Sequence, residues 1–377
     1  MKDLKIYYER QEFFKGFDKK FCKTTPKIIK ANDERAMLIY TMLNLSGSDV
    51  FNDSYIAISS DSGKTFNTPK KLTLFQSIND GVRQVYCSTC AFYHKKTNTF
   101  VSVGAYIFYK DDNHPIIKNG NSVTLSAYTT FDYEKGDYVS KPIIIKDLQD
   151  VSVLPFGQPI EYENGDVMLS FYGENANAEL SGCYTALFSF DGANLKLKKL
   201  GMPVVCDKLA RGFAEPSLAK LNDKYFFTLR ADENGYLAVS NDGFNFGEPM
   251  VWKWDDGSVL ENYNTQQRWL RFKDGLYLAY TRKGANNDHV FRHRAPMFMS
   301  RFDEDNLCLI KSTEVILVPE LGARLGNFDV TDVSDTEAWL VTAEWMQTWP
   351  PEWYNYEIPM RYGADNRIWR AIVKIEE

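Results

Sequence analysis

The densest group of potentially reactive side chains is the segment Asp288–Pro296, which reads DHVFRHRAP. It holds two of the four histidines in the chain together with Arg292 and Arg294, and Arg282 precedes it closely. Such crowded positive charge is costly unless an anion compensates it, and guanidinium groups match the geometry of a carboxylate or sulfate. We therefore expect these three arginines to bind an anionic substrate. We expect His293 to act as a general acid or base, because imidazole exchanges protons near neutral pH. A solvated loop with local ion pairs is the alternative.

A candidate catalytic carboxylate, Glu215, stands directly before a proline at the start of an apolar segment. Arg211 lies shortly before it and Arg230 shortly after it, so cations are available on both sides. Glycoside hydrolases generally use two carboxyl groups that flank the scissile bond. Spacing in the sequence does not rank the candidates for the second group, which are Asp49, Asp53 and Glu344.

The segment from Glu344 to Tyr356 is unusually aromatic, with three tryptophans and two tyrosines around a Pro-Pro pair. Flat rings beside carboxylates commonly bind the apolar face of a sugar ring. We therefore expect Trp345 and Trp349 to contact a substrate. A plug of aromatic side chains that caps the fold is the alternative.

The composition argues against several classes of function. The net charge is −6 and the basic residues are scattered, whereas nucleic-acid binding requires a basic face. No apolar run is long enough to span a membrane, and the first residues form no apolar leader, so we expect a cytoplasmic protein unless a leader was removed. Cys87 and Cys90 form a lone C-x-x-C pair without flanking histidines. We therefore expect neither a metal nor a cofactor, and a small-molecule or oligosaccharide substrate as the partner.

These residues must be positioned by elements that recur along the chain. Six segments share one plan, a short strand, a tight turn and a second apolar strand, and they start about 52 to 70 residues apart, as propeller blades do. The pairs are Thr25–Lys30 with Ala36–Met42, Ser88–His94 with Phe100–Ala105, Gln158–Tyr162 with Val167–Phe171, Glu215–Leu221 with Tyr225–Arg230, Gln267–Phe272 with Leu276–Arg282, and Phe328–Val333 with Ala338–Ala343. Almost no segment has a sustained helical period. The pattern predicts an all-β fold, a six-bladed β-propeller with four-stranded antiparallel blades.

A third and a fourth strand are expected after each pair. Those that we can bound are Ser54–Ser59 and Pro69–Thr73, Tyr236–Ser240 and Pro249–Trp252, and Met297–Phe302 and Leu307–Lys311. Because no linker divides the chain, we expect one domain over residues 1–377, with blades near 24–75, 87–148, 157–205, 214–254, 266–318 and 327–377. Either terminal strand, Leu4–Glu9 or Ile368–Ile375, could complete the last blade.

One turn carries a family resemblance. The octamer Ser59-Ser60-Asp61-Ser62-Gly63-Lys64-Thr65-Phe66 matches the Asp-box, S-x-D-x-G-x-T-[FW], at every defined position. Ser240–Phe246 is a shortened copy at the equivalent place of the fourth blade, and Ser189–Gly192 is a degenerate one. The chain therefore resembles the sialidase (neuraminidase) superfamily of Asp-box propellers over nearly its whole length. The resemblance implies that these turns are structural and face away from the active site.

The resemblance also implies where a site lies, namely in the connections between blades and in the loops that join second to third strands. Glu215 and Arg230 look like the sialidase carboxylate that tunes a tyrosine nucleophile and an arginine that holds the substrate carboxylate. Arg282 would supply a further arginine, and Asp53 or Asp49 stands where sialidases place a general acid. Other candidates for substrate binding near inner-strand starts are Arg211, Gln158, Gln266, Arg324 and Asn327.

The sequence departs from the sialidase pattern at two places. Thr24–Lys27 stands where sialidases open the first blade with an arginine, and Gly326–Phe328 replaces the segment of the nucleophilic tyrosine.

We predict an exo-acting glycoside hydrolase for an acidic, carboxylate-bearing sugar. The alternatives are a polysaccharide lyase on a uronic-acid glycan and a non-catalytic carbohydrate-binding propeller.

Overall fold

The computed structural model describes residues 5–47, 49–72, 78–79, 81–111, 114–118, 121–145, 153–175 and 178–376. These residues form two compact units. The N-terminal unit comprises Lys27–Pro216 and Gly243–Asn245, and the C-terminal unit comprises Met1–Pro26, Ser217–Asp242 and Phe246–Glu377.

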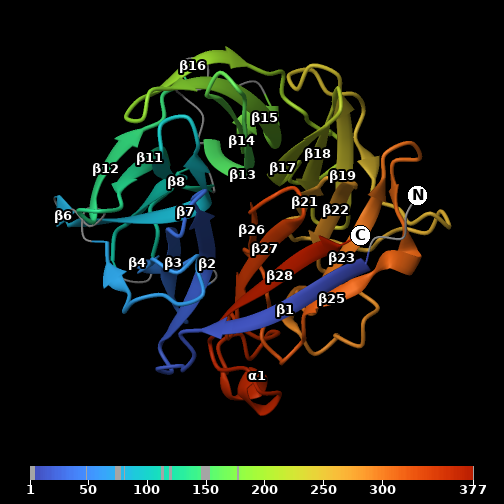
Figure 1. The fold of residues 1–377 in the computed structure, drawn as a ribbon. Coiled ribbons are helices and arrows are strands. Elements are labelled where there is room, and N and C mark those ends of the chain that lie inside the picture. The colour runs from blue at the N-terminus through green and yellow to red at the C-terminus, as the bar shows by residue number, and fades with distance from the viewer. Residues whose placement is uncertain are drawn as a thin grey trace. The chain divides into compact units, whose positions relative to one another are not determined.

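Three sheets belong to the N-terminal unit, and they are drawn from blue to light green in Figure 1. The first sheet has the order β2 (Phe21–Lys30), β3 (Ala36–Asn44), β4 (Phe51–Ser59) and β5 (Lys70–Lys71), with the start of β2 in the other unit. The second has the order β12 (Asp137–Pro142), β11 (Thr124–Asp132), β8 (Thr99–Tyr109), β7 (Val82–His94) and β6 (Ile78–Asn79), and a separate ribbon joins β9 (Ile117–Lys118) to β10 (Asn121–Ser122). The third is a meander of β13 (Val153–Glu161), β14 (Asp166–Asn175), β15 (Ala178–Phe190) and β16 (Leu195–Leu200).

Three further sheets belong to the C-terminal unit. One is a meander of β17 (Ala214–Leu221), β18 (Lys224–Arg230), β19 (Gly235–Ser240) and β20 (Met250–Val251), in which β17 begins in the N-terminal unit. The next contains β21 (Arg268–Phe272), β22 (Gly275–Tyr280), β23 (Met297–Asp303) and β24 (Cys308–Leu309), and β25 (Val315–Val318) also pairs with β23. The last has the order β26 (Asp329–Asp332), β27 (Glu337–Ala343), β28 (Ile368–Glu376) and β1 (Lys5–Phe13). The predicted six-bladed β-propeller with antiparallel blades is confirmed.

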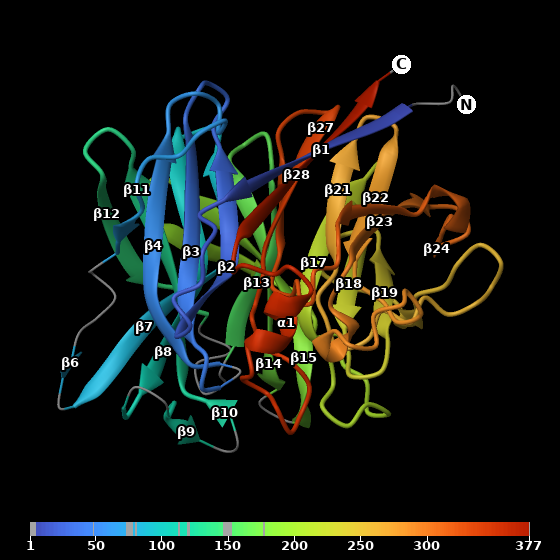
Figure 2. The same ribbon diagram turned by 90° about the horizontal axis from the view of Figure 1, so that it is seen from below.

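The predicted strand pairs agree closely with the observed ones. The last blade uses both terminal strands rather than one, since β28 pairs with β27 on one side and with β1 on the other, as Figure 2 shows. In the fifth blade the predicted fourth strand is only the two-residue β24, because the 3-10 turn η4 (Lys311–Thr313) interrupts the chain before β25. Leu4 and Thr73, the ends of two predicted strands, lie outside the described residues.

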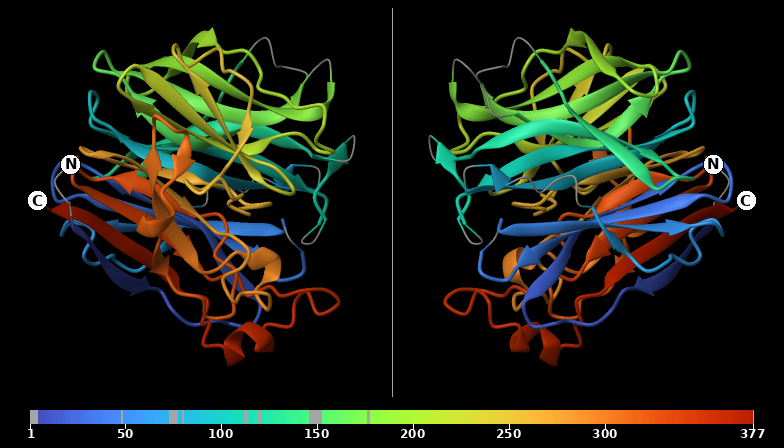
Figure 3. Two further views of the ribbon diagram at one scale, coloured as in Figure 1. Left: turned by 90° about the vertical axis from the view of Figure 1, so that its right-hand side faces the viewer. Right: turned by 90° about the vertical axis from the view of Figure 1, so that its left-hand side faces the viewer.

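Helix is confined to short connections within the described residues. The 3-10 turn η3 (Phe291–His293) lies between β22 and β23, and α1 (Glu357–Arg361), red in Figure 3, lies in the connection from β27 to β28. Each unit has its own apolar core between neighbouring sheets. In the C-terminal unit, the fully buried rings of Trp252 and Trp269 pack edge to face with Phe302 at centroid distances of 5.7 and 5.3 Å. Such packing fixes the blades from which the polar loops emerge.

The octamer Ser59–Phe66 forms a turn that is held by its own side chains. The Ser59 hydroxyl donates to Asp61 Oδ1 (2.6 Å) and accepts from the Gly63 amide (2.8 Å), while the amide and hydroxyl of Thr65 donate to the Asp61 carboxylate (2.9 and 2.6 Å). These hydrogen bonds lower the pKa of Asp61 far below its usual value. Gly63 has φ of 76°, a conformation that a side chain would strain. The turn is self-contained and supports β4 and β5.

Candidate functional site

In the C-terminal unit, the loops predicted to carry a site are joined by polar contacts. They are the connections at 252–267 and 319–328 and the second-to-third-strand loops at 281–296 and 344–367. We call the residues at their centre the tyrosine–arginine cluster, which consists of Arg230, Tyr263, Asn264, Asp288, Arg292, His293 and Arg294.

A tyrosine, a histidine and an aspartate form a chain of hydrogen bonds in this cluster. Tyr263 Oη and His293 Nδ1 lie 2.7 Å apart, and His293 Nε2 lies 3.2 Å from Asp288 Oδ1. The His293 side chain is only 15% exposed, whereas that of Asp288 is 96% exposed. An imidazole between a phenol and a carboxylate can accept the phenolic proton, and the carboxylate orients the ring and stabilises its charged form.

Two arginines meet at Asn264, the residue that follows Tyr263. Arg230 Nη2, from the end of β18, donates to Asn264 Oδ1 (2.6 Å), and Arg294 Nη2 donates to the Asn264 carbonyl. Arg294 is only 4% exposed, and its carbonyl accepts from the Leu325 amide (2.5 Å), which ties the cluster to the loop before β26. A Cβ on Gly326 would lie 2.8 Å from Arg294 Nη1, so only glycine lets this guanidinium pack there without displacing it.

The positive charges act directly on Tyr263. Partial burial raises the pKa of Tyr263, while Arg294 and Arg292 work in the opposite direction because they favour the phenolate. Lys283 Nζ lies 4.1 Å from the centre of the Tyr263 ring. The surroundings therefore combine a desolvated phenol with nearby cations and a proton acceptor.

The backbone that carries the histidine is strained. Arg292 and His293 have φ values of 57° and 51°, in the left-handed region that costs such residues of order 1–3 kcal/mol each. Asn287, fully buried, donates from Nδ2 to the carbonyls of Arg282 (2.9 Å), His293 (3.2 Å) and Ala295 (2.6 Å). One amide group thus closes the loop at 281–296 and holds His293 in place.

The aromatic loop after β27 covers this loop. Trp349 Nε1 donates to the Asp288 carbonyl (2.9 Å), and the Trp349 ring lies edge-on to His293 at 5.6 Å. Trp345 is buried under the Arg324 guanidinium, 3.3 Å from its ring centre. Because Arg324 and Trp345 are 1% and 2% exposed, their predicted contact with a substrate is not supported; they pack the loop instead. Trp349, half-buried, remains a candidate platform.

Three other predicted residues perform structural work. Arg282 forms an ion pair with Glu314, with Nε–Oε1 and Nη2–Oε2 distances of 2.8 and 2.6 Å, so its charge is compensated. The Gln266 side chain is buried and donates to the Phe328 carbonyl. Asn327, which precedes β26, has φ of 64° and shapes the entry of that strand.

Glu344, a predicted catalytic carboxylate, is 1% exposed and accepts three hydrogen bonds within its own blade. The donors are the amides of Asp365 (2.7 Å) and Arg367 (3.2 Å) and Trp369 Nε1 (3.0 Å). Burial raises its pKa, and these donors and the Arg367 charge oppose the rise. We therefore assign Glu344 to the support of the aromatic loop rather than to catalysis.

The carboxylates predicted in the first blade belong to the N-terminal unit. The loop placement of Asp53 was wrong, because β4 begins at Phe51 and includes Asp53, whose Oδ2 pairs with Lys71 Nζ (2.7 Å) across the sheet. Asp49 is exposed in the loop before β4, and its carbonyl accepts from Tyr109 Oη (2.6 Å).

Glu215, the second residue of β17, has a strained conformation, with φ of 42° directly before Pro216. Its negative charge adds to burial in raising the pKa of Cys183, so the carboxylate lies near that thiol. Arg211 is exposed, and Gln158 is buried in β13. The roles of Glu215, Arg211 and Gln158 in binding or catalysis stay predictions.

Sequence reasoning missed Tyr263 and Asn264. A signal was present in the sequence: Tyr263 and Asn264 are polar residues directly before the predicted inner-strand start at Gln266. They therefore lie in a connection between blades, where a site was expected. Among the described residues, no group of histidine, cysteine and acidic side chains could hold a metal ion. Over the same residues, no helix has the length and apolar character needed to cross a membrane.

Comparisons with known proteins agree on the fold. No protein-family model matches the chain, and no curated protein matches it by sequence. A Dyadobacter fermentans protein of unknown function matches 98% of the chain over 99% of its own length, with 15% identity and a TM-score of 0.68. The Hadza microbial sialidase Hz136 matches 93% of the chain over 65% of its own length (12% identity, TM-score 0.64), and the phage phi92 endosialidase matches 98% over 69% (12% identity, TM-score 0.61).

A sialidase from Trypanosoma rangeli, solved with a difluoro-KDN ligand, matches 97% of the chain with 13% identity and a TM-score of 0.58, and the chain spans 58% of that protein's length. At identities this low, the structural matches establish the fold alone. The chemistry has to be inferred from the residues of the site. The chain has the sialidase-like six-bladed β-propeller fold.

Proposed function

We propose that the protein is a glycoside hydrolase that acts on an acidic sugar, with the tyrosine–arginine cluster as its reactive centre. The observation that carries the proposal is the 2.7 Å hydrogen bond between Tyr263 and His293, set beside Arg292 and Arg294. A tyrosine with a proton acceptor is a suitable nucleophile for a sugar with a carboxylate, because tyrosine-nucleophile glycosidases need no second carboxylate in that role.

The chemistry follows from the order of the contacts. His293 Nδ1 takes the proton of Tyr263 Oη, and the phenolate oxygen bonds to the anomeric carbon while the glycosidic C–O bond breaks. The departing oxygen receives a proton from a general acid. Water then bonds to the anomeric carbon and gives one proton to that acid, the Tyr263–carbon bond breaks, and His293 returns the proton to Tyr263.

The arginines explain the preference for an acid. Arg230 and Arg294 are both oriented by Asn264, which preorganises their guanidinium groups before a substrate arrives. A guanidinium binds a carboxylate through charge-assisted hydrogen bonds, which are stronger than bonds between neutral groups. A neutral sugar has no carboxylate to form such bonds.

A second candidate function, a polysaccharide lyase, is favoured by the same Tyr263–His293 contact. In that reaction the pair removes the proton α to a uronate carboxylate and returns a proton to the departing oxygen, which creates a carbon–carbon double bond without water. The two reactions give different products. Only the lyase product absorbs ultraviolet light as an unsaturated uronate.

The test is an activity screen with aryl glycosides of N-acetylneuraminic acid and glucuronic acid and with uronate-containing oligosaccharides. We expect release of the aryl group by the native protein and a loss of about 10²- to 10⁴-fold in kcat for Tyr263→Phe. Tyr7→Phe, at an exposed tyrosine of β1, is the matched control and should keep full activity. Binding of acidic sugars without any turnover would overturn the proposal and favour a carbohydrate-binding propeller.

A further inference from the structure

We propose that Lys283 is a positioning residue for Tyr263 and is held in place by the ion pair between Arg282 and Glu314. The Lys283 side chain is half-buried, and its Nζ lies 4.1 Å from the centre of the Tyr263 ring. A cation over the face of a phenol interacts more strongly with the phenolate, whose negative charge spreads into the ring, than with the neutral phenol. Lys283 therefore favours the loss of the phenolic proton through its contact with the ring.

The backbone is strained on both sides of Tyr263. Glu261 and Asn264 have φ values of 60° and 50°, in the left-handed region that is costly for residues other than glycine. The Lys283 amide donates to the Glu261 carbonyl (3.2 Å). On the other side of the tyrosine, the Asn264 amide donates to the Ala231 carbonyl (2.9 Å). Each strained residue is thus fixed by another segment, and Lys283 provides the contact on the N-terminal side.

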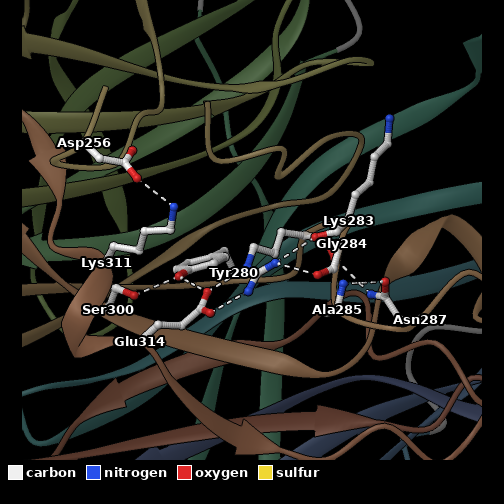
Figure 4. Close-up of polar contacts among 10 residues, drawn as sticks. Asp256, Tyr280, Lys283, Gly284, Ala285, Asn287, Ser300, Lys311 and Glu314 are labelled. Carbon is white, nitrogen blue, oxygen red and sulfur yellow. Dashed lines mark hydrogen bonds and ion pairs between the residues drawn. The ribbon is translucent and has the colours of Figure 1, made fainter. Parts of the chain in front are cut away.

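Lys283 is itself fixed by the side chain of its neighbour, Arg282. Arg282 Nη1 donates to the carbonyls of Lys283 (2.9 Å) and Gly284 (3.3 Å). The other two nitrogens of the guanidinium donate to the two oxygens of Glu314. Tyr280 Oη, at the end of β22, donates to Glu314 Oε1 (2.8 Å), as Figure 4 shows. One guanidinium group therefore ties the backbone at Lys283 to the fifth blade.

Lys283 joins three other charged or titratable groups that act on Tyr263. His293 Nδ1 lies 2.7 Å from the phenolic oxygen and is the proposed proton acceptor, and the charges of Arg292 and Arg294 favour the phenolate. All four residues belong to the loop between β22 and β23. This loop therefore brings positive charge to the tyrosine from both of its ends, with Lys283 near its beginning and the other three near its end.

The inference deepens the proposed function and rests on it for the use that is made of the phenolate. With Tyr263 as the nucleophile, the fraction of Tyr263 that is ionised limits the rate, and Lys283 raises this fraction at a given pH. Arg282, which the sequence led us to expect as an anion-binding residue, then acts one step away from the substrate, because it positions Lys283.

The first test measures the ionisation of Tyr263 and needs no substrate. Tyr263 is replaced by 3,5-difluorotyrosine, whose phenol ionises at lower pH because fluorine withdraws electrons, and the fluorine NMR signal is followed as the pH rises. Lys283→Met should raise the titration midpoint by about 0.5–1.5 pH units, the size expected for a cation over a ring. Lys283→Arg keeps the charge and should keep the original midpoint. An equal midpoint with Lys283 and with Lys283→Met would overturn the inference.

Lys311→Met is the matched control. Lys311 also lies over an aromatic ring of the C-terminal unit, with its Nζ 5.9 Å from the centre of the Trp254 ring. It forms an ion pair with Asp256 (2.7 Å), which is drawn in Figure 4. We expect this variant to leave the midpoint in place. A shift equal to that of Lys283→Met would mean that the loss of any positive charge has this effect, and would contradict a specific role of Lys283.

The role of the ion pair is tested by the double variant Arg282→Met/Glu314→Leu, which removes both charges and leaves the net charge unchanged. Its midpoint should rise by less than that of Lys283→Met, because Lys283 keeps its charge and loses only the donor to its carbonyl. Arg282→Lys is a milder variant if the double variant impairs folding, since a single nitrogen replaces the three of the guanidinium. An unchanged midpoint in a folded variant would overturn the supporting role of the pair.

The second test is the pH profile of kcat on the best aryl glycoside. Lys283→Met should shift the profile toward alkaline pH by the same amount as the midpoint, and Lys283→Arg should restore it. A loss that is equal at every pH and is not restored by Lys283→Arg would mean that Lys283 serves folding, and the inference fails. If the midpoint shifts as expected but the native protein turns over no glycan, the proposed function fails while the effect of Lys283 on Tyr263 stands.

Discussion

Tyr263, in the connection before the fifth blade, and Tyr280, at the end of β22 in that blade, have surroundings that differ in one respect that decides their chemistry. Burial raises the pKa of both Tyr263 and Tyr280. Tyr263 shares its proton with an imidazole and is flanked by arginines that favour the phenolate, whereas Tyr280 Oη donates to the Glu314 carboxylate, whose negative charge raises its pKa further. The first phenol is therefore prepared to lose its proton, and the second is fixed as a donor. Burial alone does not mark a reactive tyrosine; the neighbouring charge does.

The sharpest test of this difference is the coupling between Tyr263 and His293. Tyr263→Phe and His293→Gln should each lower kcat by about 10²- to 10⁴-fold, and the double variant should be no slower than the worse single variant, because the two groups act as one unit. Steady-state kinetics on the best aryl glycoside measures this. Multiplicative losses would show that the two side chains act independently.

Arg294 should determine the preference for acidic sugars. Arg294→Gln removes a charge-assisted contact worth about 1.5–3 kcal/mol, so kcat/KM for a glucuronide should fall roughly tenfold to a hundredfold. The corresponding glucoside, measured in parallel, should be little affected. Equal losses on the two substrates would mean that Arg294 serves folding instead.

At Tyr280 the expected effect is on stability. Tyr280→Phe removes the Oη contacts with Ser300 and Glu314, both 2.8 Å, and should lower the free energy of unfolding by about 1 kcal/mol. Denaturant unfolding measures this change, provided that the free energy of unfolding depends on denaturant concentration with the same slope in both proteins. A loss of activity on an aryl glycoside comparable to that of Tyr263→Phe would erase the distinction between the two tyrosines.

The pH profile gives a further prediction. Arg292 lowers the pKa of Tyr263, so Arg292→Gln should raise that pKa and shift the activity profile toward alkaline pH. Arg301→Gln is the control, at an arginine of β23 that pairs with Asp274, and it should leave the profile in place. A shift toward acid would contradict the proposed role of the phenolate.

The smallest expected effect is in the turn at Ser59–Phe66, which belongs to the N-terminal unit. The folded-state pKa of Asp61 is lowered, so its contribution to stability is present above its unfolded pKa and is lost as the pH falls through the folded value. The difference in melting temperature between the native protein and Asp61→Asn should therefore shrink as the pH is lowered from neutral toward 3. A constant difference would mean that the carboxylate charge is not what holds the turn.

The blades could be predicted from sequence because the features that define them are local. Apolar strands and tight turns recur in every blade, and β3, β18 and β27 begin within a residue of their predicted positions. The roles of individual polar residues could not be predicted in the same way. The sequence gives no sign that Arg282 pairs with Glu314, because the two residues are thirty-two positions apart. Tyr263 was missed because its partner, His293, is thirty residues away.

The pairing of β1 with β28 has a consequence for how the protein is made. Ile6 is synthesised long before its register partner, Ile375, so β1 cannot pair until β28 has been made. Until then β1 remains an unpaired edge strand, open to association with other chains. Removal of residues 1–13 should leave the outer edge of β28 exposed and promote aggregation, and the same segment supplied as a separate peptide should restore solubility.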